Sequence, residues 1–154
     1  MPANLHHAQE ALRQQLGAEA LRLTTGTSPR VAFVSTIEDA VRDADLVIDC
    51  VPDELESKLE IFWLLDRMAP PHTVLATPTT RLSIADLGAC TYRADRCIAI
   101  AAEASELTGF ELEKDRPELL LRTGPATTDE TVTLVTDFWR KVGFNPRVER
   151  EPAV

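Results

Sequence analysis

The sequence predicts an α/β fold with a mainly parallel sheet flanked by helices. Three apolar runs, at 46–51, 74–76 and 97–102, have the length of buried strands. Helical periodicity or helix-start signals separate these runs, and strands that alternate with helices at this spacing are typical of a parallel sheet. No internal repeat interrupts the pattern, so we expect residues 1–154 to form a single domain.

The N-terminal part of the chain predicts a helix, a short strand and a second helix. Apolar residues recur every three to four positions between Ala3 and Leu23, which indicates an amphipathic helix. Residues 24–29 break that pattern, and the apolar segment Val31–Val34 is predicted to be a strand. Ser35 and Glu38 have the spacing of a capping box, which predicts a short helix after Ser35.

The central part predicts strands that are covered on both faces. The run 46–51 is apolar apart from Asp49, as expected for an internal strand of a parallel sheet. Asp53 is placed to cap the helix that follows, and the prolines at 70 and 71 end that helix. A capping box at Ser83–Asp86 predicts another helix before the strand at 97–102.

The C-terminal part begins with an acidic segment, residues 103–118, which is predicted to be a surface loop or a mobile helix. Residues 119–121 then predict a short strand. Thr127 and Glu130 have capping-box spacing and predict a helix that ends at Gly143. Residues 147–149 predict a weak final strand.

Composition excludes several classes of partner. The net charge is −9, and no basic cluster is present, so neither nucleic acid nor an anionic membrane is an expected partner. No apolar run reaches the roughly 18 residues of a membrane span, and the N-terminus lacks a signal pattern, so we expect a cytoplasmic protein. The cysteines at 50, 90 and 97 have no metal-ligand spacing, which predicts reduced, buried thiols and no metal site.

Several segments, in order along the chain, resemble motifs of the 3-hydroxyacyl-CoA dehydrogenase family. The stretch from Asp45 to Ile84 resembles the family's ADLVIEAVPE…K…F…LD…AP…T…A(T/S)NTSSLSI without a gap. Later matches are Tyr92–Ile98 with R(P/Q)(E/D)RF(I/A)G, Thr123–Thr131 with GPATSDET, and Val142–Val148 with LGKxPVVVKD. The resemblance implies the Rossmann-like NAD-binding domain of an oxidoreductase of fatty acid metabolism that acts on CH-OH groups.

Three parts of the family pattern are missing from this sequence. No glycine-rich strand, turn and helix precedes Val31, so the phosphate cradle of a dinucleotide site is not expected. The family's catalytic His and the Asn of the same motif fall on Ala101 and Ala104, and its orienting Glu falls on or near Leu120. The family's C-terminal helical domain would begin where the sequence stops.

Three positions keep residues that the family uses near its cofactor. The resemblance places Asp53 and Lys58 beside the nicotinamide ribose, and Thr80 near the nicotinamide. Pro78 and Arg81 replace an Asn and a Ser of the same pocket. A structural role remains open for each: Asp53 as a helix cap, Lys58 as an ion-pair partner of Asp53 or Glu54, and Thr80 as a turn residue.

These observations leave three functions open. The first is a catalytically silent module that binds or regulates. The second is a component of an NAD-dependent 3-hydroxyacyl-CoA dehydrogenase that still binds NAD, a small nucleotide or an acyl-CoA weakly and that another polypeptide completes. The third is a structural oligomer without a ligand. Without a first strand, the edge of the strand at 46–51 is predicted to pair with its copy in a homodimer, or with Val31–Val34 in a monomer.

Overall fold

The computed structural model describes residues 10, 31–108 and 112–152, and it divides into two compact units, Met1–Arg42 and Asp43–Val154. In the first unit, α2 (Ile37–Val41) begins after Thr36, whose hydroxyl accepts a hydrogen bond from the Asp39 amide at 3.1 Å. The cap is therefore Thr36 and not Ser35. The helix predicted at 3–23 lies outside the described residues except for Glu10, which is helical.

The predicted strand at Val31–Val34 is wrong. These four residues form no strand, and the side chains of Val31, Phe33 and Val34 are exposed. β-propensity alone does not make a strand, because an extended segment needs a neighbour to take up its backbone hydrogen bonds.

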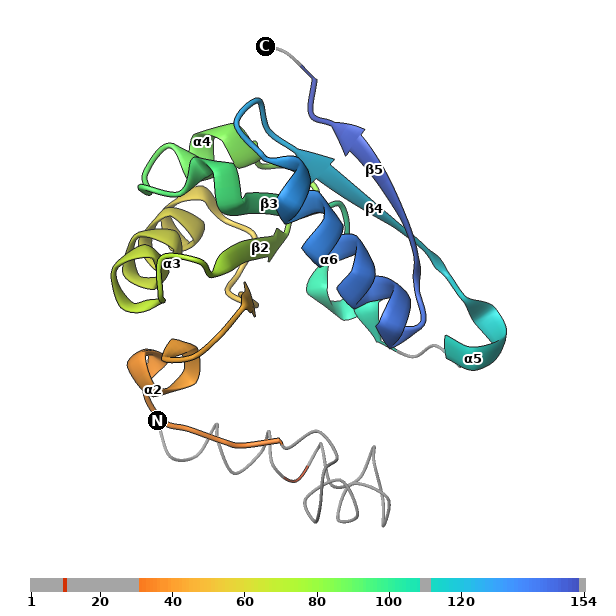
Figure 1. Cartoon of the computed structure of the whole chain (residues 1–154), viewed down its shortest axis with the longest axis horizontal. Coiled ribbons are helices and arrows are strands. Elements are labelled where there is room, and N and C mark those ends of the chain that lie inside the picture. Colours follow the sequence, from red (N-terminus) through yellow and green to blue (C-terminus); the bar gives the residue numbers. More distant parts are fainter. Residues whose placement is uncertain (1–9, 11–30, 109–111, 153–154) are drawn as a thin grey trace. The chain divides into compact units, whose positions relative to one another are not determined.

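The second unit contains one five-stranded sheet (Figure 1). Its strands are β1 (Leu46–Ile48), β2 (Val74–Pro78), β3 (Cys97–Ile100), β4 (Glu118–Thr123) and β5 (Asn145–Arg150), in that order across the sheet. The first three strands are parallel, β4 runs antiparallel to β3, and β5 runs parallel to β4. The predicted α/β class with a mainly parallel, Rossmann-like sheet is confirmed.

Alternate residues of each strand point to opposite faces of the sheet. One face packs against α6 (Asp129–Val142) through a core that includes Ile98, Leu121, Val135 and Trp139. The residues that point to the other face include Leu75 and Cys97. On the α4 side, α4 (Ile84–Gly88) contacts both β3 and α3 (Leu55–Met68).

The three cysteines differ in exposure. Burial raises the pKa of the Cys97 thiol to about 12. Cys50 is exposed, contrary to the predicted burial of all three thiols.

Two of the predicted helix ends are confirmed, and a third cap lies one residue from its predicted position. Ser83 caps α4 by accepting from the Asp86 amide at 3.3 Å, and Gly143 ends α6 in the left-handed region with φ of 119°, both as predicted. The cap of α6 is Thr128 instead of Thr127. The Thr127 hydroxyl instead donates to the Cys97 carbonyl at 2.9 Å and so joins this turn to β3.

The acidic segment contains two short helices in its described parts. The 3₁₀ turn η2 (Ala104–Leu107) is stabilised by a reciprocal capping box between Glu103 and Glu106. After residues 109–111 the chain forms α5 (Leu112–Asp115). None of the helices in the described part of the chain is long and apolar enough to cross a membrane.

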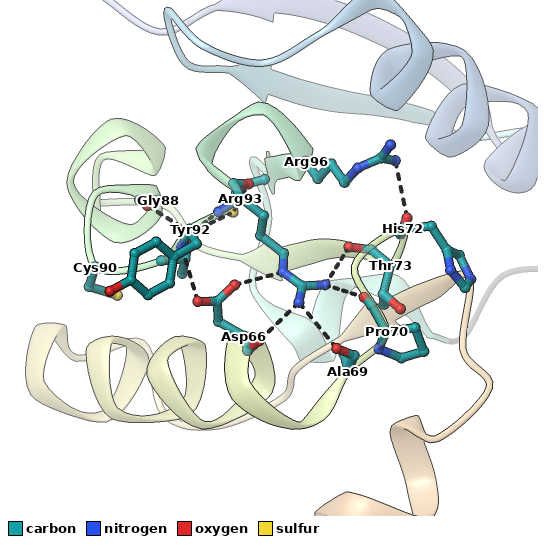
Figure 2. Close-up of polar contacts among 12 residues, drawn as sticks. Asp66, Ala69, Pro70, His72, Thr73, Gly88, Cys90, Tyr92, Arg93 and Arg96 are labelled. Carbon is teal, nitrogen blue, oxygen red and sulfur yellow. Dashed lines mark hydrogen bonds and ion pairs between the residues drawn. The ribbon is translucent and has the colours of Figure 1, made fainter.

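Arg93 joins the end of α3 to the start of β2, at the edge of the sheet where the parallel strands begin (Figure 2). Its guanidinium donates to the Asp66 carboxylate at 2.7 Å and to four backbone carbonyls, those of Asp66, Ala69, Pro70 and Thr73, at 2.7–3.2 Å. Five bonds use all five N–H donors of an arginine. The side chain therefore satisfies carbonyls that the end of α3 leaves without a helical partner.

Candidate functional site

A cleft of about 330 Å³ lies where the parallel strands end. Ligands of open α/β sheets bind at this edge of the sheet. Three segments line the cleft: residues 50–53 after β1 together with Lys58 of α3, the last residue of β2, Pro78, and residues 103–105 after β3. Two of the predicted cofactor residues, Asp53 and Lys58, and the substituted position Ala104 therefore meet in one cavity.

Asp53 holds two of these segments together. Its carboxylate accepts hydrogen bonds from the Thr79 hydroxyl at 2.5 Å and from the Thr80 amide at 3.1 Å. Its backbone carbonyl accepts from the Arg81 guanidinium at 2.6 Å. The predicted role of Asp53 as a helix cap is wrong: the residue before α3 is Glu54, which makes no side-chain cap bond. The Asp53 carboxylate instead accepts hydrogen bonds from Thr79 and Thr80, which follow β2.

The Asp53 carboxylate is held in its ionised form. Burial by itself would raise its pKa. The hydrogen bonds from Thr79 and Thr80 outweigh burial, together with the nearby charges of Lys58 and Arg81, and the pKa lies below its ordinary value. A carboxylate of this kind attracts positive charge and is a poor proton acceptor at neutral pH.

Lys58 pairs with Asp49 and not with Asp53 or Glu54, so the predicted partners are wrong. The Nζ atom lies 2.7 Å from Asp49 Oδ1, and the two side chains are 1% and 2% exposed. Asp49 follows β1 directly and also accepts from the Val51 amide at 3.3 Å. This pairing was missed, although a lone Asp inside an apolar strand signals that a buried cation is needed nearby.

Thr80 lies at the margin of the site. It is exposed, and its amide rather than its side chain makes the contact with Asp53. Its neighbour Thr79 is buried, and its hydroxyl also accepts from the Leu82 amide at 3.0 Å. Thr79 is thus the side chain that orders this loop, and the resemblance gave no signal for it.

Ala101 and Leu120 lie side by side. The Ala101 amide donates to the Leu120 carbonyl at 2.8 Å, one step beyond the pairing of Ile100 with Leu121 between β3 and β4. Both residues line a second cavity of about 300 Å³, whose lining residues are mostly apolar and also include Glu106 and Glu118. No histidine lines either cavity within the described residues, so neither offers an imidazole base.

No metal centre is found in the described ranges, 31–108 and 112–152, because no three His, Cys, Asp or Glu side chains come together there. The cleft offers charge and shape for binding a ligand. Its fixed carboxylates and its buried, paired lysine can recognise a ligand.

Comparison with known proteins identifies the relatives of this chain. The family profile described as 3-hydroxyacyl-CoA dehydrogenase, NAD binding domain, matches residues 2–101. The L-carnitine dehydrogenase of Burkholderia mallei is 32% identical over 97% of this chain and 43% of that protein. The probable 3-hydroxybutyryl-CoA dehydrogenase of Bacillus subtilis is 39% identical over 46% of this chain and 24% of that protein. The chain thus spans less than half the length of these relatives.

Solved structures share the fold. The 3-hydroxybutyryl-CoA dehydrogenase of Escherichia coli superimposes with a TM-score of 0.76 at 22% identity, over 97% of this chain and 31% of that one. An NAD⁺-dependent pyridine carboxylic acid 5-dehydrogenase gives 0.73 at 24% identity, over 99% of this chain and 48% of that one. With the family profile matching most of the sequence, this chain belongs to the NAD-binding domain family of the 3-hydroxyacyl-CoA dehydrogenases.

Proposed function

We propose that this chain is a binding module derived from a dehydrogenase NAD-binding domain, without dehydrogenase activity of its own. The observation that carries the proposal is the contact between Ala101 and Leu120. The resemblance assigns these positions to the catalytic base and to the residue that orients it. They occupy neighbouring positions across β3 and β4, yet a methyl group and an isobutyl group cannot accept a proton.

The ligand of the module is a nicotinamide nucleotide, held weakly in the cleft around Asp53 and Lys58. Both side chains are largely committed to contacts inside the protein, with Thr79, Thr80 and Asp49. They offer a ligand few new hydrogen bonds, so we expect a dissociation constant of about 1 mM or weaker for NAD. The proposed setting is the cytoplasm.

The first test is the activity of the chain with NAD and 3-hydroxybutyryl-CoA. We expect no NADH formation, because the loss of a general base alone costs about 10²–10⁴-fold in rate. A matched pair of variants sharpens the test. Ala101→His with Leu120→Glu places a base and its orienting carboxylate at the two positions, and Ala101→Asn with Leu120→Gln is a polar control without a base.

Turnover by the unaltered chain, abolished by a change in its cleft, would refute the proposal. Turnover that appears only in the His and Glu variant would support it, because the missing base would then be the main defect.

A second candidate is a component of an NAD-dependent 3-hydroxyacyl-CoA dehydrogenase that another polypeptide completes. The edge of the sheet favours it. All three residues of β1 are half-buried while every residue of β2 is buried, and no strand pairs with the outer side of β1 in the described part of the second unit. If a second polypeptide co-purifies with this chain and the complex oxidises 3-hydroxybutyryl-CoA with NAD, this candidate would be favoured. Absence of any thermal shift with NAD, NADH, ADP or acetoacetyl-CoA would favour a ligand-free structural role instead.

A further inference from the structure

One side of the helix α3 carries a stripe of mostly apolar side chains. The stripe consists of Ser57, Ile61, Leu64 and Met68, which recur every three to four residues and therefore lie in a row. The first three are half-buried, and Met68 is 39% exposed. Ser57, Ile61 and Leu64 line a groove of about 300 Å³. These four residues, the α3 stripe, form a surface on which another element can pack.

The α3 stripe faces past the edge strand β1. On the other side of α3, the Asp66 carboxylate binds Arg93 in the segment after α4 (Figure 2). Ile61 and Leu64 lie about 140° and about 160° around the helix from Asp66. Because α4 contacts β3, and the strands run in the order β1, β2, β3, the side of α3 opposite α4 is the β1 side. In agreement, the groove is also lined by Val51, which follows β1.

A second copy joined at β1 would bring its own α3 to packing distance. In the described part of the second unit, no strand pairs with the outer side of β1. A two-fold axis perpendicular to the sheet would pair β1 antiparallel with its copy and leave both α3 helices on the same face. A helix that connects two adjacent parallel strands lies over them, so with strands about 4.8 Å apart the axis of α3 lies about 5 Å from the two-fold axis. The two helix axes are then about 10 Å apart, close to the roughly 8–10 Å of packed helices.

The charges of α3 complement those of an antiparallel copy. Glu60 lies in the first half of the helix and Arg67 in its last turn, and both are exposed. They are about 20° apart around the helix and point away from the sheet, about 140–160° from the buried Phe62. The two-fold axis therefore brings Glu60 of each copy towards Arg67 of the other, above the point where Ile61 of one copy meets Leu64 of the other.

We propose that α3 packs antiparallel against α3 of a second copy of this chain, with the α3 stripe as the contact. This helix contact extends the interface from the backbone of β1 to side chains, and it takes the apolar groove out of water. The interface is independent of nucleotide binding, since the cleft lies at the ends of the strands.

Charge reversal tests the helix contact. Sedimentation velocity over a series of concentrations measures the dimer dissociation constant of the unaltered chain and of its variants. Glu60→Arg and Arg67→Glu should each raise this constant by about fivefold or more, because each replaces two exposed ion pairs with two like-charge pairs. The double variant, Glu60→Arg with Arg67→Glu, restores opposite charges and should return the constant to within about twofold of the unaltered value.

Two comparisons exclude other causes of these effects. Arg67 stacks on the Trp63 ring, with 4.1 Å between the guanidinium carbon and the ring centroid. This contact is lost in Arg67→Glu and in the double variant alike, so recovery in the double variant reports on the pair between copies. Glu130→Arg reverses an exposed charge on α6, away from α3, and should leave the dissociation constant unchanged.

Each outcome decides the proposal. A mass of 17.0 kDa for the unaltered chain overturns it and leaves the α3 stripe to a different polypeptide. A dimer that neither single variant weakens overturns the helix contact, even if β1 forms the interface. Weakening without recovery in the double variant overturns the antiparallel arrangement, and weakening with recovery supports it.

Discussion

Lys58 and Asp49 show how single side chains constrain this cleft. An ion pair that is 1% and 2% exposed has lost nearly all of its hydration, and each charge is stabilised chiefly by the other. Lys58 therefore lines the cleft without being free to bind a phosphate, and its position depends on Asp49. Asp53 is likewise held by a hydrogen bond from Thr79. Each charged side chain of the cleft is therefore positioned by a partner within the protein.

We expect Lys58→Met to lower the free energy of unfolding by about 3–5 kcal/mol, because it leaves the Asp49 carboxylate buried without a cation. The double variant Asp49→Leu with Lys58→Met should recover most of the loss. Arg147→Met is the matched control, because the pair of Arg147 and Glu118 is more than half exposed and is worth no more than about 1 kcal/mol. Urea denaturation measures all three. If Lys58→Met costs no more than the control, the buried pair does not stabilise the fold.

At the scale of elements, the sequence predicts the interior better than the junctions. Apolar runs identify β2 and β3 because strands buried on both faces consist mostly of apolar residues, with Thr77 as the polar exception in β2. Val31–Val34 has the same local appearance but pairs with no strand among the described residues, and local propensity cannot reveal whether a neighbouring strand exists. Caps shift for a related reason: Asp53 is a good cap by residue type, yet it bonds to Thr79, 26 residues away.

The same limit applies to the candidate site. The resemblance places Asp53 and Lys58 after β1, Ala101 after β3 and Leu120 within β4, which are strands that the sequence identifies. It does not predict that Asp49 holds Lys58 or that Thr79 holds Asp53. Such contacts depend on side-chain directions across strands, which neither periodicity nor motif spacing encodes.

Arg93 is expected to be the residue that fixes the end of α3 against β2. Arg93→Lys should lower the free energy of unfolding by about 2–4 kcal/mol, since an ammonium has three donors and cannot reach five acceptors in the plane of a guanidinium. Arg96→Lys is the control, because the Arg96 guanidinium donates a hydrogen bond of 3.1 Å to the His72 carbonyl at an exposed position. This change should cost less than about 1 kcal/mol. Hydrogen exchange should locate the effect at residues 66–73. A loss spread evenly over the sheet would contradict a local role.

At the scale of the whole molecule, the two edges of the sheet differ. The edge strand β5 carries Pro146 and the charged residues Arg147, Glu149 and Arg150, which discourage pairing with another chain. The edge strand β1 is Leu-Val-Ile and carries no such protection. A groove of about 300 Å³ is lined in part by Val51, Ile61 and Leu64, and Val51 lies in the segment that follows β1. These features favour assembly through β1 and not through β5.

We expect a homodimer in which β1 pairs antiparallel with its copy across a two-fold axis. The Asp45 carbonyl and the Asp49 amide bond to β2, so by alternation the backbone groups of Leu46 and Ile48 face outward. Ile48→Pro removes an outward donor and should give a folded monomer, whereas Val47→Pro removes a bond to β2 and should unfold the protein. Light scattering should give twice the 17.0 kDa of one chain for the unaltered protein and 17.0 kDa for Ile48→Pro. A mass of 17.0 kDa for the unaltered protein would exclude the dimer, and a dimer that survives Ile48→Pro would place the interface elsewhere.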